Sequence, residues 1–181
     1  MSRKLHITEM NRLDIGTYKE RKKIPLTILL DNVRSMNNIG SIFRTADAFR
    51  IERMILCGIT AVPPHPMIHK TALGAEESVE WEYSPSILDR VLALKAEGYE
   101  IWALELATHS LPPEQSLLQK NQKVALVIGN EVHGVSDEVI ALADRCIEIP
   151  QYGTKHSLNV SVSTGIALYT LVSPLLSSLE N

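Results

Sequence analysis

Polar residues that could bind or activate a ligand lie where an apolar helix is expected to begin. In the stretch KHSLNVSVSTGIALYTL (155–171), Ser157 and Asn159 alternate with Leu158 and Val160, which is the period of a half-buried strand. The run then continues, without a turn signal, into residues with helical spacing. Amides and hydroxyls at such a position either cap the helix or reach a bound molecule, and the residues alone leave both interpretations open.

Three apolar runs end in polar or glycine-containing loops. They are IWALELATHS (101–110), VALVIGNEVHG (124–134) and CIEIPQYGTKHSLNVS (146–161). In open parallel sheets, ligands bind just beyond the carboxyl ends of the strands. Gly129 and Gly153 would let the backbone approach a ligand closely. Each loop alone is equally well a turn, but the three together predict a site for a small, partly apolar cofactor.

A further polar set lies in the stretch NNIGSIFRTADAFR (37–50). One helical face collects its apolar residues, which are Ile39, Ile42, Phe43, Ala46 and Phe49. Arg44 lies away from that face, and Asn38 stands at the helix entrance. Asn37 or Asn38 could serve only as an N-cap, and Arg44 could simply face solvent. These structural interpretations stay open beside a functional one.

Several signatures of nucleotide, acyl and metal chemistry are missing from the sequence. No G-x-G-x-x-G motif follows an apolar run, and no G-x-S-x-G elbow occurs. The stretch GNEVHGVS (129–136) has the glycine spacing of a phosphate-binding loop, but Val135 occupies the place of the required lysine. His65 and His69 lie in a proline-rich stretch without a third ligand nearby, so we expect no metal.

Short apolar runs alternate with helical patterns along the chain, and this rhythm predicts an α/β fold. Strands are expected at 24–31, 53–58, 99–106, 123–130 and 145–150, with an additional edge strand at 78–83. Helices are expected at 37–50, about 67–74, 86–98, 136–143 and 158–178. We therefore predict a mostly parallel sheet with helices on both faces.

Composition and charge narrow the class of protein. Cys57 and Cys146 lie within apolar runs, as reduced core cysteines of cytosolic proteins do. No apolar run reaches the roughly 20 residues of a membrane span, and the N-terminus lacks an apolar signal core, so we expect a cytoplasmic protein without membrane contact. Residues 1–24 carry seven Lys or Arg and three acidic residues, a net of +4, which leaves −7 for the rest of a chain of net −3.

This basic arm fits a polyanionic partner, although a solvated tail fits equally well. The length of 181 residues suits a single folded domain. We assign residues 1–23 to a basic N-terminal extension and residues 24–181 to that domain.

Three blocks, in this order, resemble the SpoU/TrmH family of RNA 2′-O-ribose methyltransferases, a part of the SPOUT superfamily. They are NNIGSIFRTADAF (37–49), LVIGNEVHGVSDE (126–138) and IEIPQYGTKHSLNVSVSTGIAL (147–168). The resemblance covers residues 24–178, nearly the whole domain. It implies a deep trefoil knot near the C-terminus, a rare exception to the rule against threaded chains. It also implies that S-adenosylmethionine (AdoMet) binds in the knot and that the protein is a homodimer.

The resemblance also implies which residues form the site. AdoMet would be bound by Leu104, Gly129, Ile149, Ser157 and Leu158, with Leu158 facing the adenine. The family's catalytic positions correspond to Asn38, Arg44, Glu131, Ser157 and Asn159. Ser157 and Asn159 would reach the reacting ribose, whereas we expect Ser161 and Ser163 to bond only to the helix backbone.

The chemistry then requires a ribose 2′-oxygen, a methyl carbon and a sulfur held in line. Arginine is often proposed as the base in this family, but its pKa of about 12.5–13.8 makes a neutral guanidine costly near neutral pH. We expect Arg44 instead to bind the target phosphate and to stabilise the developing oxyanion, while the proton leaves through water or a phosphate oxygen. Glu131 would orient Arg44 or a backbone amide.

RNA is the expected substrate, with tRNA favoured over rRNA by analogy alone. The basic arm, Arg34, Arg50 and Lys70 are candidates for contacts with its backbone. Two other functions stay open: an RNA-binding SPOUT module without catalysis, and a base methyltransferase of a sister SPOUT family. Some sister families form a cysteine adduct with the base. Such an adduct is not expected here, because both cysteines of this chain lie in expected strands instead of loops.

Overall fold

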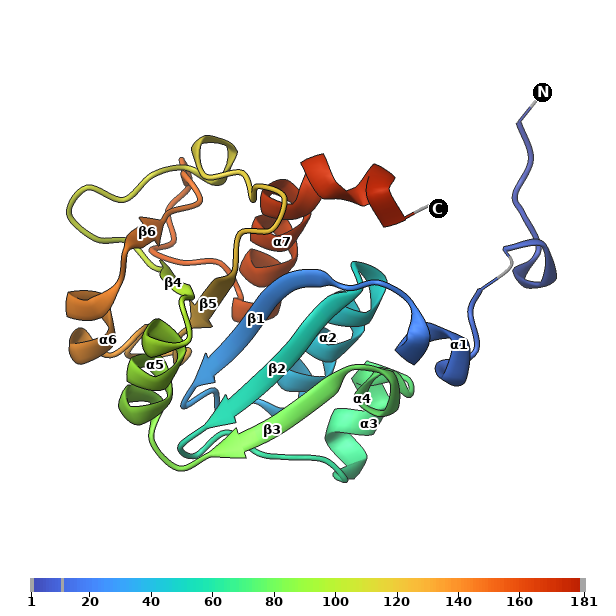
Figure 1. The fold of residues 1–181 in the computed structure, drawn as a ribbon, viewed down its shortest axis with the longest axis horizontal. Helices are drawn as coiled ribbons and strands as arrows, with labels where there is room; N and C mark the ends of the chain where they lie inside the picture. The colour runs from blue at the N-terminus through green and yellow to red at the C-terminus, as the bar shows by residue number, and fades with distance from the viewer. Residues whose placement is uncertain (1, 11, 180–181) are drawn as a thin grey trace.

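A single parallel sheet of six strands forms the centre of the molecule (Figure 1). The computed structural model describes residues 2–10 and 12–179. The strands follow the spatial order β3-β2-β1-β5-β4-β6, and every neighbouring pair is parallel. Their bounds are β1 (Ile24–Asp31), β2 (Ile51–Cys57), β3 (Glu80–Ser84), β4 (Glu100–Leu104), β5 (Val124–Ile128) and β6 (Arg145–Ile147). The predicted α/β sheet is confirmed, with the edge strand at the expected place.

Helices cover both faces of this sheet. The α-helices are α1 (Ile15–Glu20), α2 (Met36–Ala48), α3 (Pro66–Ala72), α4 (Ala75–Ser78), α5 (Ile87–Ala96), α6 (Asp137–Leu142) and α7 (Val160–Leu176). Short 3₁₀ turns are η1 (Ile7–Glu9), η2 (Pro113–Gln115) and η3 (Ser177–Leu179).

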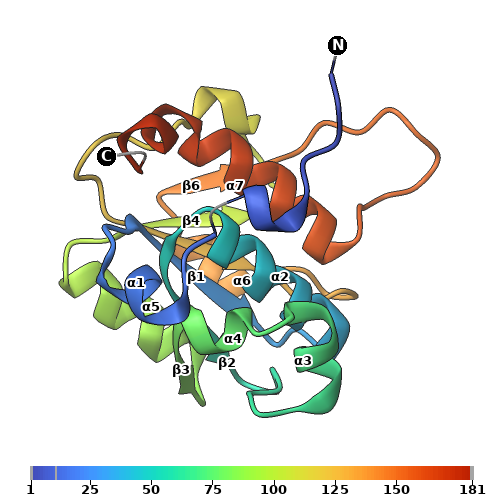
Figure 2. The same ribbon diagram turned by 90° about the vertical axis from the view of Figure 1, so that its right-hand side faces the viewer.

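The two faces bury different residues of the same strands, because successive side chains of a strand point to opposite sides. In β1, Leu26, Ile28 and Leu30 pack with α2, α3 and α7, whereas Leu29 packs with α5 and α6. A strand buried on both sides reads as a continuous apolar run, which is why IPLTILL gives no alternation. Figures 1 and 2 show the resulting layers, with the sheet between the two sets of helices.

The strand order brings the loops of the predicted site together. β1 pairs with β5, and β5 pairs with β4, although 92 residues separate the end of β1 from the start of β5 along the chain. All strands are parallel, so their carboxyl ends meet at one edge of the sheet. The loops after β4, β5 and β6 therefore converge there, as the sequence predicted.

The last helix differs in detail from its prediction. The alternating stretch around Ser157 forms no strand: residues 151–159 are an exposed loop that projects from the body of the molecule (orange in Figure 2), and α7 begins at Val160. α7 buries Ala167, Leu168 and Leu171 in the core. By length and composition, Val160–Leu179 is also the one described segment apolar enough to cross a membrane, but its inner face packs against the sheet.

The N-terminal extension packs on the domain more closely than its charge suggests. Asp14 caps α1 by accepting a hydrogen bond from the Thr17 amide, at 2.9 Å. Tyr18 is buried, and the Lys23 ammonium lies 3.5 Å from the centre of its ring. α1 lies beside α4, a four-residue helix that the sequence analysis did not identify (Figure 1).

The crossing of α2 and α3 depends on a glycine. A Cβ atom at Gly40 would collide with the hydroxyl of Thr71 and the carbonyl oxygen of Ile68. We expect Gly40→Ala to lower the free energy of unfolding by about 1–3 kcal/mol, because one helix must move to admit the methyl group. Urea unfolding measures this. In Gly165→Ala, a matched change inside α7, the methyl group meets no atom within 4 Å apart from the neighbouring backbone of its own helix, so we expect no loss there. Equal losses in both variants would contradict the packing argument.

Candidate functional site

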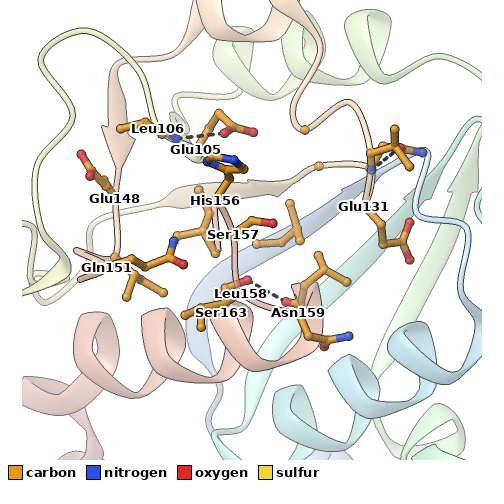
Figure 3. Close-up of a pocket in the computed structure, with 18 of the residues that line it drawn as sticks. Glu105, Leu106, Glu131, Glu148, Gln151, His156, Ser157, Leu158, Asn159 and Ser163 are labelled. Atoms are coloured by element: carbon orange, nitrogen blue, oxygen red, sulfur yellow. Dashed lines mark hydrogen bonds between the residues drawn. The ribbon is translucent and has the colours of Figure 1, made fainter. Parts of the chain in front are cut away.

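A cavity of about 720 Å³ lies at the carboxyl ends of β4, β5 and β6 (Figure 3). The loops that follow these strands and the first turn of α7 form its walls. This is the position at which the sequence predicted a cofactor site, and the walls combine apolar side chains with exposed backbone groups.

The loop after β5 is closed by a short backbone pairing. Asn130 and Gly134 exchange two hydrogen bonds of 2.9 Å, and the Asn130 side chain accepts from the amides of Val132 and His133. A Cβ atom at Gly129 would overlap the backbone of Gly134 and Val135. Gly129 is therefore required by this close approach within the loop, which lies in the wall of the cavity.

Glu105 joins the loop after β4 to the loop after β5. Its Oε1 accepts a hydrogen bond from the Leu106 amide at 2.9 Å, and its Oε2 accepts from the Val135 amide at 3.0 Å. The sequence analysis did not identify this residue. Its only signal was a carboxylate directly after a buried strand, which is more often a surface residue.

Glu131 connects the same wall to the start of α2. Its carboxylate accepts hydrogen bonds from the amides of Arg34 and Ser35, both at 2.9 Å, and from the side-chain amide of Asn38 at 3.0 Å. The Asn38 side-chain oxygen accepts in turn from the Asn159 side chain at 3.1 Å. Asn38 is thus bonded to two residues that lie 93 and 121 residues further along the chain, and three segments meet in one hydrogen-bonded chain.

These contacts keep Glu131 ionised. Partial burial raises the pKa of this carboxyl, but the hydrogen bonds from Arg34, Ser35 and Asn38 outweigh it, and the net pKa lies below the ordinary value of 4.5. Both oxygens already accept donors, so the carboxylate serves as a fixed anchor.

Asn159 has two structural roles at the entrance of α7. Its Oδ1 accepts from the amides of Ser161 and Val162, so this residue is the N-cap, while its Nδ2 reaches Asn38. The capping interpretation, one of the two left open by the sequence, therefore holds here. The Ser163 hydroxyl donates to the backbone carbonyl of Val160, as expected, whereas the Ser161 hydroxyl donates to the Asn159 side chain and not to the backbone.

The start of α2 corrects one structural alternative. Neither Asn37 nor Asn38 is the N-cap; Ser35 holds that position, with its hydroxyl accepting from the Asn38 amide at 3.3 Å. The Asn38 side chain is thereby free to face Glu131 and Asn159.

The residues predicted to bind the cofactor all line the cavity; they are Leu104, Gly129, Ile149, Ser157 and Leu158. Leu158 is 38% exposed and is labelled beside Ser157 in Figure 3. Apolar side chains from separate loops, next to backbone groups near Gly129, suit an adenine ring and the polar edges around it. The site thus fits a cofactor of the AdoMet kind.

Two predicted site residues do not line this cavity: Asn38, which is hydrogen-bonded to Glu131 and Asn159 in its wall, and Arg44, which has no such contact. Arg44 is the more distant of the two. It lies six residues beyond Asn38 on α2, about 9 Å further along the axis and about 120° around it. Its side chain is exposed and lines two other hollows, on the outer side of α2.

Comparison with known proteins decides the family. Residues 25–169 match the SpoU rRNA Methylase family. The chain belongs to this family. It is 34% identical over 151 residues to the tRNA (guanosine(18)-2′-O)-methyltransferase of Aquifex aeolicus, covering 83% of this chain and 70% of the relative. It is 30% identical to the 23S rRNA (guanosine-2′-O-)-methyltransferase RlmB of Haemophilus ducreyi, covering 93% and 68%.

Solved SpoU structures share its architecture. The TrmH/SpoU tRNA modifying enzyme of A. aeolicus superposes with a TM-score of 0.75 at 31% identity, covering 87% of this chain and 78% of that one. An AdoMet-bound rRNA methyltransferase from Sinorhizobium meliloti gives 0.77 at 28% identity, covering 89% and 60%. These SPOUT neighbours imply the C-terminal knot that the resemblance predicted, and AdoMet is the cofactor bound in this fold.

The lowered pKa of Glu131 predicts how stability depends on pH. A carboxyl with a depressed pKa stabilises the fold above its unfolded pKa of 4.5, and this contribution disappears as the pH falls through the folded value. We expect Glu131→Gln to lower the free energy of unfolding at pH 7 by about 1 kcal/mol, because the side chain is exposed and its new amide group faces other donors. The difference from the unmodified protein should shrink below pH 4.5.

Urea unfolding at pH 7 and pH 3.5 measures both effects. Glu114→Gln removes an exposed carboxylate outside the cavity and should leave stability at both pH values unchanged. A Glu131→Gln penalty of the same size at both pH values would show that its ionisation is irrelevant.

Proposed function

We propose that this protein transfers the methyl group of AdoMet to a ribose 2′-hydroxyl of tRNA or rRNA. The observation that carries the proposal is the chain Glu131–Asn38–Asn159, which fixes two side-chain amides at the edge of the cofactor cavity. AdoMet, when bound, supplies an electrophilic methyl group, so the protein's main task is alignment.

The described geometry assigns different tasks to these residues. Glu131 has no oxygen free of donors, so we assign it to positioning and not to proton removal. Asn38 and Asn159 each keep one further amide hydrogen, and Ser157 keeps its hydroxyl, for contact with the ribose. The proton of the 2′-hydroxyl leaves through water or a phosphate oxygen of the RNA, because an arginine stays charged at neutral pH and does not accept it.

Arg44 would act at the cavity of a second copy of this chain. It lines two hollows on the outer side of α2 and does not line the cavity of its own chain. α7 beside it exposes an apolar stripe of Val162, Ile166 and Tyr169, at helical spacing, which suits burial in a homodimer. In a two-fold dimer each α2 would then face the partner's cavity, and Arg44 would bind the target phosphate there.

Two further assignments complete the proposal. We favour tRNA as the substrate because the Aquifex and Thermus thermophilus relatives at 34% and 30% identity are named tRNA (guanosine(18)-2′-O)-methyltransferases. Reduced cysteines favour the cytoplasm. Cys57 is fully buried, and burial, then the charge of Asp31, raise its pKa to about 12, which disfavours base methylation through an adduct of this cysteine.

Methyl transfer from labelled AdoMet to unmodified tRNA and rRNA transcripts tests the function. After digestion to nucleosides, we expect the label in a 2′-O-methylnucleoside. Label on a base would refute the reaction assignment, and no transfer to any RNA, together with intact AdoMet binding, would favour a binding module without catalysis.

The role of Arg44 gives a sharper prediction. We expect Arg44→Ala to lower kcat by about 10²–10³-fold, the cost of one lost donor to a developing oxyanion, with AdoMet affinity unchanged. Calorimetry with AdoMet checks the affinity. Loss of AdoMet binding would mean that Arg44 is structural.

Mixing two inactive variants tests whether the site is shared between subunits. A dimer of one Arg44→Ala chain and one Asn38→Ala chain keeps one intact site if Arg44 acts across the interface. Random mixing should then recover about a quarter of the unmodified activity, because half of the dimers are mixed and each has one good site. No recovery of activity would mean that Arg44 acts at the cavity of its own chain or that the protein is a monomer.

A further inference from the structure

A second hollow, of about 520 Å³, lies where the N-terminal extension meets α2 and α4. The extension contributes Arg12 and Tyr18, the last turns of α2 contribute Arg44 and Asp47, and the turn after α2 contributes Arg50. Figure 1 shows α1 against α4 at this side of the molecule, away from the loops of β4, β5 and β6. We refer to it as the extension cavity.

The extension cavity carries excess positive charge. Within residues 2–10 and 12–179, none of Arg12, Arg44 and Arg50 takes part in an ion pair or donates a side-chain hydrogen bond. The one carboxylate in the lining, Asp47, accepts a hydrogen bond of 2.6 Å from the hydroxyl of Ser78. Three arginines against one aspartate leave a net charge of +2. Unpaired guanidinium groups around one hollow favour an anion.

Tyr18, which lines the same cavity, has a buried hydroxyl without a partner among the described residues. Tyr18 is only 6% exposed, and its hydroxyl has no hydrogen-bond partner within the described chain. Burial, then the charge of Asp47, raise the pKa of this phenol, so it stays a proton donor at neutral pH. A buried donor left unpaired costs free energy that a bound acceptor would recover.

Arg50 occupies a backbone conformation that does not favour arginine. Its φ of 46° lies in the left-handed region, where glycine and asparagine are preferred. Its backbone is used in the fold: the amide donates to Asp47 at 3.0 Å and the carbonyl accepts from Ile24 at 2.8 Å. The Arg50 side chain makes no hydrogen bond or ion pair within the described chain, so the turn itself does not require an arginine. Anion binding by the guanidinium group would explain why an arginine stands there.

We propose that the extension cavity binds phosphate groups of the RNA strand next to the target nucleotide. The inference rests on the proposed function, because it takes RNA as the ligand. Guanidinium groups bind phosphate through paired hydrogen bonds, and the Tyr18 hydroxyl supplies a neutral donor. Arg44 belongs both to this cavity and to the proposed reacting centre, so one strand could run from one to the other. The extension thereby becomes part of the substrate-binding surface.

RNA affinity as a function of salt tests the proposal. The probe is unfractionated tRNA, because phosphate contacts do not depend on sequence. For the double variant Arg12→Gln/Arg50→Gln we expect the dissociation constant to rise on the order of tenfold at 0.15 M salt, and the slope of log affinity against log salt to fall by about 0.7 for each lost contact. AdoMet affinity should not change, since neither residue lines the cofactor cavity.

Lys22→Gln is the matched control for charge, because Lys22 is an exposed residue of the same extension and does not line the cavity. Equal effects of Lys22→Gln and Arg12→Gln on affinity and slope would overturn the proposal. Tyr18→Phe should weaken tRNA binding about threefold while leaving thermal stability equal or higher, since the lost hydroxyl is unpaired in the free protein. Weaker binding with an equal loss of stability would indicate a structural role only.

Two outcomes separate this inference from the proposed function. If the unmodified protein methylates RNA but the double variant binds tRNA normally, the cavity proposal fails and the function stands. If no RNA is methylated but the double variant loses tRNA affinity, the function fails and the cavity stands. Competition by inorganic phosphate at millimolar concentration, without any effect of the variants on tRNA binding, would identify a site for free phosphate and refute RNA as its ligand.

Discussion

The carboxylate of Glu131 is the contact on which the site depends. It accepts from two backbone amides that precede α2 and from the side chain of Asn38, and through Asn38 it reaches the cap of α7. The amides before a helix are among the groups that the helix itself leaves unsatisfied. One ionised side chain after β5 thus accepts hydrogen bonds from the free amides at the start of α2. The same contacts fix the distance between α2 and the cofactor cavity.

The same saturation limits the chemistry of these residues. Glu131 accepts three donors, and the Asn159 oxygen accepts from the first turn of α7, so neither group is available as a base without breaking the structure around it. Methyl transfer at this site would then rely on alignment and on a charge brought from outside the cavity. An arginine with no partner within the described chain meets that need, provided that a second subunit presents it.

The sequence predicted most of the fold because its information is local. Buried parallel strands read as aliphatic runs, and helices as periodic ones, so all six strands were found within a few residues. α4 escaped because a helix of four residues, entered through a left-handed Gly74, has no period to detect. The docking of the extension also escaped, since a single buried Tyr18 in a basic segment has no signature in sequence.

The site was less predictable than the fold, because its contacts join residues that are far apart in the sequence. The types of Ser157, Asn159 and Gly129 marked loops at strand ends, and a resemblance supplied their proposed roles, but spacing could not show which side chains touch. The contact between Asn38 and Asn159 spans 121 residues and depends on the strand order. The position of Arg44 on the outer side of α2 follows from the turn of about 100° per residue of the helix, which a sequence can give, whereas its proposed role at a partner's cavity depends on an interface that local spacing does not encode.

The walls of the cofactor cavity differ in how firmly they are held, and this follows from the same contacts. Glu105 and the Asn130–Gly134 pairing fix the loops after β4 and β5. The segment 151–158 makes no hydrogen bond within the described chain, and Tyr152 in it is 96% exposed. Two walls are therefore fixed by hydrogen bonds, whereas the third, which carries Ser157 and Leu158, has none to fix it within the described chain. A ligand that contacts this third wall would therefore use part of its binding free energy to fix the wall, which the two hydrogen-bonded walls do not require.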